Sequence, residues 1–387
     1  MIVQSLRKLG FAVVLTGVSM FAGAAATAQT SDGEGDEGPN AEASAAEAQE
    51  FAQMRNWMAE EAARQRRFVE TLRTSAAPRD WAVASQIFVY PDSDSSDAMA
   101  AMEKRQSQQA ELLRTAALAA PDDKLVQWLA LFEMPHAGGG CASPAAPRDR
   151  VDAVLRLEPD NGFALLPALK EAVAAKDATA IDTVLAQIAA APRHDDHVAD
   201  YTLVLLDVAA RHPDAAMRMP DHAANALDAD DVALLGASMQ ARQIGASLYG
   251  LTKVCDAAEQ TDADLRRFAA CADIGRRLSR ESPNFTVRLT GFDLLRKSAQ
   301  FDETDAAAER ELRWLTEQAQ GLAEREQAGF VPAARRAWLE SRDDVASMRA
   351  VLGHYGISAT PSAGWMPRDD DASDESSDAS SDETGGR

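Results

Sequence analysis

The sequence lacks the motifs that mark common catalytic sites. It contains no Gly-x-Ser-x-Gly elbow for a serine nucleophile and no His-Glu-x-x-His pair for zinc. The glycine run Gly138-Gly139-Gly140 is followed by Cys141, so it lacks the Gly-Lys-Ser/Thr ending of a phosphate-binding loop. We therefore predict that the chain is not an enzyme, has no catalytic residues and uses no cofactor.

Basic residues are also scarce. The 387 residues include 39 Lys and Arg against 61 Asp and Glu, a formal net charge of -22. Phosphate binding needs clustered cations, so a nucleic-acid partner is disfavoured. Much of the acidity lies near the two ends, since residues 29–50 hold seven acids and no base, and residues 369–387 hold eight acids and one Arg. Both segments have almost nothing apolar, so we predict that they are disordered.

Only one stretch is long, apolar and uncharged. Residues 9–26 follow Arg7 and Lys8 and lead to the small residues Ala26-Thr27-Ala28. This pattern predicts a signal peptide over residues 1–28, cleaved between Ala28 and Gln29. An uncleaved membrane anchor is the alternative, but the second half of the run is Ala and Gly rather than Leu and Ile. We expect a periplasmic or secreted protein that does not contact the membrane after cleavage.

Three cysteines are present, and export places them in an oxidising compartment. Cys255 and Cys271 flank a predicted helix turn, so we predict a disulfide between them. Cys141 is then the odd one left. No base or cation stands near it in the sequence to activate its thiol.

The region between the acidic ends has the pattern of amphipathic helices. Alanine and long polar residues dominate, and period-two alternation is hard to find. Residues 81–90 are the one ambiguous stretch, since they suit either a short helix or a strand. Short helices are not stable alone, so we predict an all-α fold of stacked antiparallel helix pairs. The predicted helices after the first long segment are 97–119, 124–133, 150–157, 162–175, 179–190, 196–210, 230–242, 245–258, 262–280, 285–297, 305–324, 331–339 and 342–352.

Prolines punctuate this pattern at a regular interval. Pro121, Pro159 and Pro192 each follow an apolar helix, at spacings of 38 and 33 residues. A proline ends one helix, and an Asp or Asn after it can cap the next. The sequence Leu157-Glu158-Pro159-Asp160-Asn161, followed by Ala168-Leu169-Lys170-Glu171-Ala172, resembles a boundary and first helix of tetratricopeptide-like repeats, and the resemblance covers roughly residues 110–196.

That resemblance implies a helical scaffold with a concave surface that binds a peptide or a partner helix. We divide the central region into a tetratricopeptide-like part, residues 51–212, and a C-terminal helical part, residues 213–368. The function we expect is a protein-interaction or scaffolding module of the bacterial envelope, with a protein or peptide partner.

Two other functions are weighed against this one. His194 and His197 stand three residues apart with two aspartates between them, so they could share a divalent ion on one helix face. A metal-binding protein or metal-dependent hydrolase centred on them is the first alternative. The second is an envelope chaperone with a helical groove. The histidines follow Pro192 where a helix starts, and acids there are expected as helix caps. We therefore predict no metal site.

Overall fold

The computed structural model describes residues 62–87, 98–131, 148–212, 250–256, 265–325 and 329–367, with single positions at 52, 56, 59, 60, 248 and 327. Most of these residues are helical and none forms a strand, and their one β pairing is an isolated bridge between Asn161 and Arg193. The predicted all-α class is confirmed. The helices are α3 (Pro78–Gln86), α4 (Ala98–Ala119), α5 (Lys124–Leu131), α6 (Arg148–Leu157), η1 (Gly162–Leu165), α7 (Leu166–Ala174), α8 (Ala178–Ala190), α9 (Val198–Arg211), α11 (Leu265–Glu281), α12 (Phe285–Lys297), α13 (Glu303–Glu324), α14 (Phe330–Ser341) and α15 (Asp344–His354).

Where both can be compared, the observed helix ends lie within three residues of the predicted ones, except that the helix predicted over 245–258 ends at Val254. In the ambiguous stretch 81–90, residues 81–86 are helical. They belong to α3, which has Pro78 in its first turn. Residues 1–28, residues 29–50, Cys141, the predicted helix 230–242 and residues 369–387 lie outside the described residues. No helix in the described part of the chain is long and apolar enough to cross a membrane.

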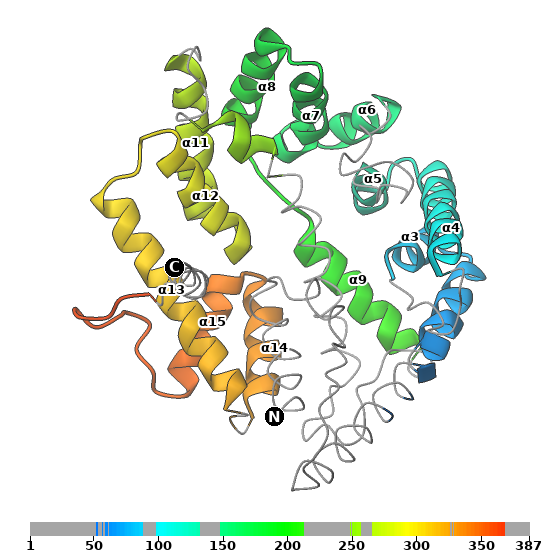
Figure 1. The fold of residues 1–387 in the computed structure, drawn as a ribbon. Helices are drawn as coiled ribbons and strands as arrows, with labels where there is room; N and C mark the ends of the chain where they lie inside the picture. The colour runs from blue at the N-terminus through cyan, green and yellow to red at the C-terminus, as the bar shows by residue number, and fades with distance from the viewer. Residues whose placement is uncertain are drawn as a thin grey trace, which may run out of the picture.

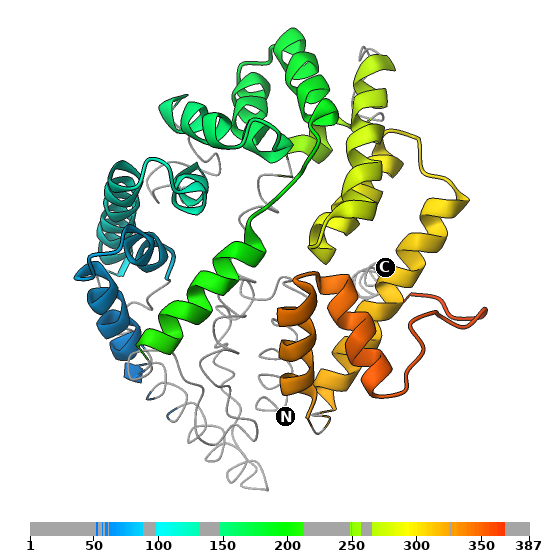
Figure 2. The same cartoon turned by 180° about the vertical axis from the view of Figure 1, so that it is seen from behind.

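The helices follow one another around an arc (Figures 1 and 2). The arc runs from α3 and α4 through α5, α6, α7 and α8 to α11 and α12, and ends with α13, α14 and α15. Helix α9 leaves this path and crosses the interior of the arc back to α3. Its buried residues Tyr201, Leu205 and Val208 join the core that contains Ala82 and Val83 of α3.

Three hydrophobic cores follow the arc. The first contains Val83 of α3, the second Phe163 of η1 and the third Leu315 of α13. Neighbouring cores share helices. Helix α5 gives Val126 to the first core and Trp128 to the second. Helix α12 gives Leu294 to the second core and Phe292 to the third. The second core also joins helices before residue 213 to helices after it, so the apolar packing continues across the predicted domain division. That division stays a prediction.

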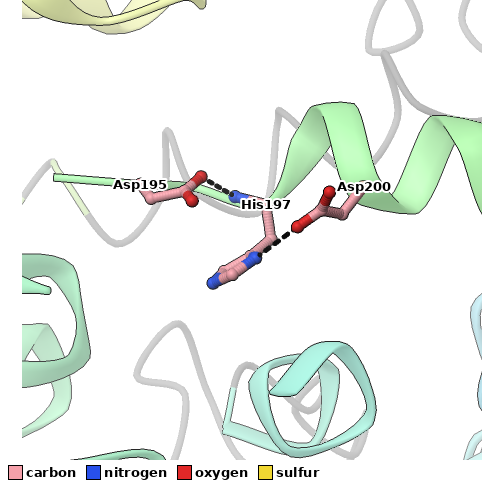
Figure 3. A group of neighbouring side chains, drawn as sticks. All are labelled: Asp195, His197 and Asp200. Atoms are coloured by element: carbon pink, nitrogen blue, oxygen red, sulfur yellow. Dashed lines mark hydrogen bonds and ion pairs between the residues drawn. The ribbon is translucent and has the colours of Figure 1, made fainter. Parts of the chain in front are cut away.

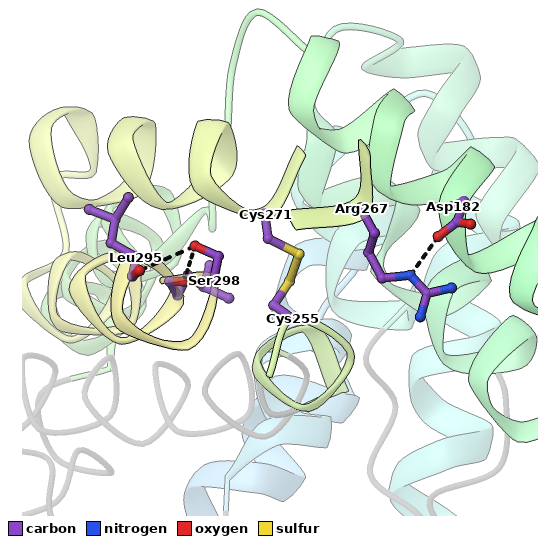
Figure 4. Close-up of a disulfide and its surroundings, with 7 residues drawn as sticks. Asp182, Cys255, Arg267, Cys271, Leu295 and Ser298 are labelled. Atoms are coloured by element: carbon purple, nitrogen blue, oxygen red, sulfur yellow. Dashed lines mark hydrogen bonds and ion pairs between the residues drawn. A yellow bond between two sulfur atoms is a disulfide. The ribbon is translucent and has the colours of Figure 1, made fainter. Parts of the chain in front are cut away.

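Cys255 and Cys271 form a disulfide with an S–S distance of 2.03 Å and a Cα–Cα distance of 5.7 Å (Figure 4). The predicted pairing is confirmed, and it fastens residues 250–256 to α11. Both cysteines are fully buried in the second core. On the same helix, Arg267 donates to Asp182 of α8 at 2.5 Å, so α11 is also tied to the helices that precede it in the arc.

Candidate functional site

Five loops between helices form a row in which each loop is joined to the next, the first two through Arg156 of α6. They comprise residues 121–123, 159–161, 193–196, 282–284 and 342–344, and we call this row the loop ladder. The first three are the Pro-punctuated segments that the sequence pattern singled out. Their spacing of one helix pair therefore has a structural meaning, because each loop returns the chain to the same edge of the array.

Each loop of the ladder carries a side chain that caps the following helical segment. In every case a carboxylate or amide oxygen accepts a backbone N–H of the first turn, which would otherwise lack a partner. Five helical segments therefore begin at the ladder. The bonds are Val126 to Asp123 (3.3 Å), Phe163 to Asn161 (3.2 Å), Val198 to Asp196 (3.1 Å), Thr286 to Asn284 (2.9 Å) and Ala346 to Asp343 (2.8 Å).

Hydrogen bonds join neighbouring loops. Both backbone bonds and side-chain bonds take part, so the loops tie together the helices that begin at them. The joining bonds are Arg156 to the Pro121 carbonyl (3.1 Å), Arg193 N–H to the Asp160 carbonyl (3.1 Å), Gly162 N–H to the Arg193 carbonyl (2.8 Å), Asn284 Nδ2 to Asp196 Oδ2 (2.9 Å) and Asp344 N–H to the Pro283 carbonyl (2.8 Å).

His197 lies at the middle of the ladder, just before α9 (Figure 3). Its Nδ1 lies 3.0 Å from Asp200 Oδ2, and its Nε2 lies 2.6 Å from Glu158 Oε2. Its backbone N–H donates to Asp195 at 2.9 Å. The backbone of His197 has a φ of 55°, a left-handed conformation that is uncommon outside glycine. This turn aims the imidazole at Glu158 as the chain enters α9.

Burial and pairing set the charge of this group. His197 and Glu158 are 3% and 1% exposed, and Arg193 also donates to Glu158 at 2.8 Å. Burial works against the charged imidazole, but the hydrogen bonds to Asp200 and Glu158 raise the pKa of His197 to about 9. Burial likewise opposes ionisation of Glu158, yet His197 and Arg193 lower its pKa to about 2. At neutral pH the pair is therefore an imidazolium and a carboxylate.

Two further carboxylates meet at the start of α12. Asp196 accepts from Asn284, and Asp344 accepts from the backbone N–H of Phe285 at 3.2 Å. Burial raises the pKa of each acid to about 6, and in Asp344 the nearby charge of Asp196 adds to the effect. In Figures 1 and 2, α9 and α12 start close together near the middle of the molecule. The N-termini of α9, α12 and α15 thus converge on two acids that titrate near pH 6.

The structure separates the two histidines. His194 places its ring edge-to-face on Phe163, with centroids 5.5 Å apart, and its Nε2 lies 2.9 Å from the carbonyl of Ile188. Burial lowers its pKa. The interpretation that His194 and His197 share a helix face is wrong, because both precede α9 in a non-helical segment. Their alternative interpretation as part of a helix start is supported, since Asp196 caps α9.

The chemistry open to this cluster is limited by its hydrogen bonds. The metal-ligand atoms of Asp195, His197 and Asp200 lie within 4.8 Å of one another, and His194 is not in this group. A metal ligand or general base needs a free lone pair on the imidazole. Both nitrogens of the His197 imidazolium donate to carboxylates, so neither offers one. Asp195 is in turn paired with Arg193 at 3.1 Å.

An open groove of about 340 Å³ adjoins the ladder. One wall is the extended segment 192–195 with Ala199 and Asp200 at the start of α9, and the other is the turn from α11 to α12. Its lining mixes Arg193, Arg277, Asp195, Asp200 and Glu281 with the apolar side chains of Ala199 and Leu278.

Sequence reasoning missed Glu158, Asn284 and Asp344 as members of this cluster. A signal was available, because Glu158-Pro159-Asp160-Asn161 and Glu281-Ser282-Pro283-Asn284 have similar composition and both precede a helix. No protein-family model, curated protein or solved structure matches this chain. The resemblance to tetratricopeptide-like repeats therefore stays a prediction.

Proposed function

We propose that this chain is an exported, non-catalytic helical protein that serves as an interaction or scaffolding module of the bacterial envelope, with a protein or peptide partner. One observation carries the proposal. The ionisable groups that most resemble a reactive site, His197 with Glu158, Asp195 and Asp200, are engaged with one another and with Arg193, and they hold helices together. Such a cluster supports a rigid surface rather than a reaction.

A curved row of helices suits this role. Arrays of packed helix pairs present extended surfaces on which partners bind. The continuous cores and the ladder keep this surface in one shape, so little ordering entropy is lost when a partner binds. The export signal over residues 1–28 gives the compartment in which we expect the partner.

The rival function is a metal centre at His197, and it is favoured by the spacing of Asp195, His197 and Asp200. Asp200 separates the two functions, because its side chain is 57% exposed and its loss leaves the core intact. We expect the purified full chain to contain substoichiometric metal, and Asp200→Asn to leave metal content and thermal stability in zinc or manganese unchanged. Stoichiometric metal that Asp200→Asn removes would favour the rival.

The interaction itself is tested by photo-crosslinking in native envelopes. A crosslinking residue is placed in turn at Ala199, at Leu118 on α4 and at Met366 near the C-terminal end. Leu118 and Met366 are 70% and 75% exposed, so neither replacement disturbs the core. We expect one position to capture a single defined partner. Absence of a specific crosslink at all three positions contradicts the proposed function.

A further inference from the structure

We infer that the groove beside the loop ladder binds an extended segment of a basic partner, which pairs with the backbone of residues 192–195. The inference rests on the proposed function and names its binding site. The groove is formed by two walls, and bonds on either side fix their separation. Asn284 donates to Asp196 at 2.9 Å near one end, and Arg277 donates to the Ala191 carbonyl at 2.6 Å near the other. The groove is therefore preformed.

The backbone of the extended wall is satisfied along one edge only. Arg193 exchanges backbone bonds with Asp160 and Gly162, and Asp195 exchanges bonds with the side chain of Asn161 at 3.1 and 2.9 Å. In an extended segment alternate residues direct their N–H and C=O groups to opposite edges. His194 lies between the two paired residues, and among the described residues no group bonds its backbone N–H or C=O.

An open backbone edge beside a groove is the arrangement that binds peptides by strand addition. Main-chain hydrogen bonds give affinity, and the groove selects alternate side chains. Ala199 and Leu278 provide an apolar floor for one aliphatic side chain of the peptide. The edge is too short for a long sheet, so the contact is a short bridge opposite His194, and the side chains must add to the affinity.

Charge selects a basic segment. Asp195, Asp200 and Glu281 line the groove, against Arg193 and Arg277. Asp195 pairs with Arg193 and Asp200 with His197, so Glu281 is the lining acid that attracts the basic segment most directly. Arg193 is already shared by three acids, since it also pairs with Glu158 and Asp160. Burial lowers the pKa of His194, so its ring adds no positive charge at neutral pH. The whole chain carries a net charge of -22, which further favours encounter with a basic partner.

The test uses random linear peptides displayed on phage and selected on the full, disulfide-bonded chain. We expect enriched peptides to combine an aliphatic residue with Lys or Arg. Ala199→Trp fills the groove, so it should weaken these peptides about tenfold or more, and Glu281→Lys should weaken the basic ones similarly. Ala210→Trp is the matched control, because Ala210 is exposed on the same helix away from the groove. Circular dichroism verifies that each variant is folded.

Backbone pairing has its own readout. In the tightest-binding peptide, one backbone nitrogen at a time is methylated. At one position, beside the aliphatic residue, methylation should abolish binding. The inference is overturned if no peptide is enriched, if enriched peptides are acidic, if they bind Ala199→Trp as tightly as the native chain, or if no single N-methylation weakens them. Any of these results together with a specific envelope crosslink refutes the groove and leaves the proposed function standing. Absence of both refutes the function as well.

Discussion

Glu158 and His197 are almost inaccessible to water, and both carry charge at neutral pH. Water normally solvates such groups, and removing it costs several kcal/mol for each ion. Here the cost is offset because Glu158 also accepts from Arg193 and His197 also donates to Asp200. Each member of the pair therefore depends on the other, and removal of one leaves an uncompensated charge in the core.

We predict that His197→Leu lowers the free energy of unfolding by about 3 kcal/mol, because Glu158 loses its buried partner. Glu158→Leu should cost a similar amount, and the double variant should cost clearly less than the sum. Asp200→Asn is the control, with a cost of about 0–1 kcal/mol, because Asp200 is largely exposed. Urea unfolding measures all four, and strictly additive losses would show that the two side chains do not act as a pair.

The ladder's acids also predict how stability depends on pH. Asp196 has a pKa raised from 3.8 to about 6, so its ionised form is disfavoured in the folded state. The free energy of unfolding therefore falls as the pH rises through 6 and Asp196 loses its proton. Glu158 has the opposite sign, because its pKa is lowered from 4.5 to about 2, and its contribution is lost as pH falls through 2. His197 contributes fully below pH 6.5 and loses its contribution as pH rises through about 9.

We therefore expect the free energy of unfolding to decrease between pH 5 and pH 7, because Asp196 and Asp344 ionise side by side. In Asp196→Asn the decrease should be smaller, and the pKa of Asp344 should move down from about 6, since a nearby negative charge has been removed. Carboxyl-carbon NMR measures that pKa. An unchanged pKa in the variant would contradict the coupling of the two acids.

At the scale of helices, α11 and α12 pack closely because glycine occupies both sides of their contact. A Cβ atom at Gly291 would lie 2.4 Å from the backbone nitrogen of Ser279 and 2.8 Å from the Gly275 carbonyl. These are backbone atoms of the facing helix, so they cannot move without shifting α11. Two loops of the ladder depend on this placement, because Asn284 at the start of α12 bonds Asp196 and Pro283 bonds Asp344.

We predict that Gly291→Ala destabilises the protein by about 1–3 kcal/mol, because the added methyl group forces the two helices apart. Gly353→Ala is the matched control. A Cβ there meets no atom within 4 Å, so the better helix propensity of alanine should leave stability unchanged or raise it by up to about 1 kcal/mol. Thermal unfolding compares the two variants. Equal effects on stability would show that the contact between α11 and α12 can accommodate a methyl group at Gly291.

Helices were predictable from the sequence because their signals are local. The range 285–297 matches α12 at both ends, with Asn284 as its cap and basic residues in its last turn. Caps were less predictable where several candidates adjoin, as at the start of α15, which Asp343 caps. The site depends on contacts between distant residues, such as Glu158 with His197 and Asp196 with Asn284. The pattern of a single sequence does not show which residues far apart in the chain lie close together in the fold.

At the scale of the molecule, α9 braces the arc. Its start is fixed in the ladder, and its last residue, Arg211, bonds Asp80 of α3 through two nitrogens at 2.7 and 3.0 Å. Asp80 is fully buried and also accepts from Ser75 at 2.5 Å. A bidentate pair with a buried carboxylate is much stronger than an exposed ion pair. The residues that join these helices are 131 positions apart in the chain.

We predict that Arg211→Met lowers the free energy of unfolding by about 3 kcal/mol or more, because it leaves the Asp80 carboxylate buried in the first core without its cationic partner. Hydrogen exchange should accelerate along α9 and α3, and amides of α13 and α15 should change little. The control is Arg349→Met, because its ion pair with Glu311 lies near the surface and is worth less than about 1 kcal/mol. Unchanged exchange in α9 would mean that Arg211 does not hold the brace.

The central claim is that His197 is a structural cation in a joint between helices, without a free lone pair for a metal or a proton-transfer step. Nitrogen-15 NMR of the imidazole, recorded from pH 5 to pH 10 with and without zinc, tests it directly. We predict that His197 stays doubly protonated until its pKa of about 9 and that stoichiometric zinc leaves its signals unchanged at neutral pH. Titration near pH 6.5 with a shift on zinc addition would contradict the account.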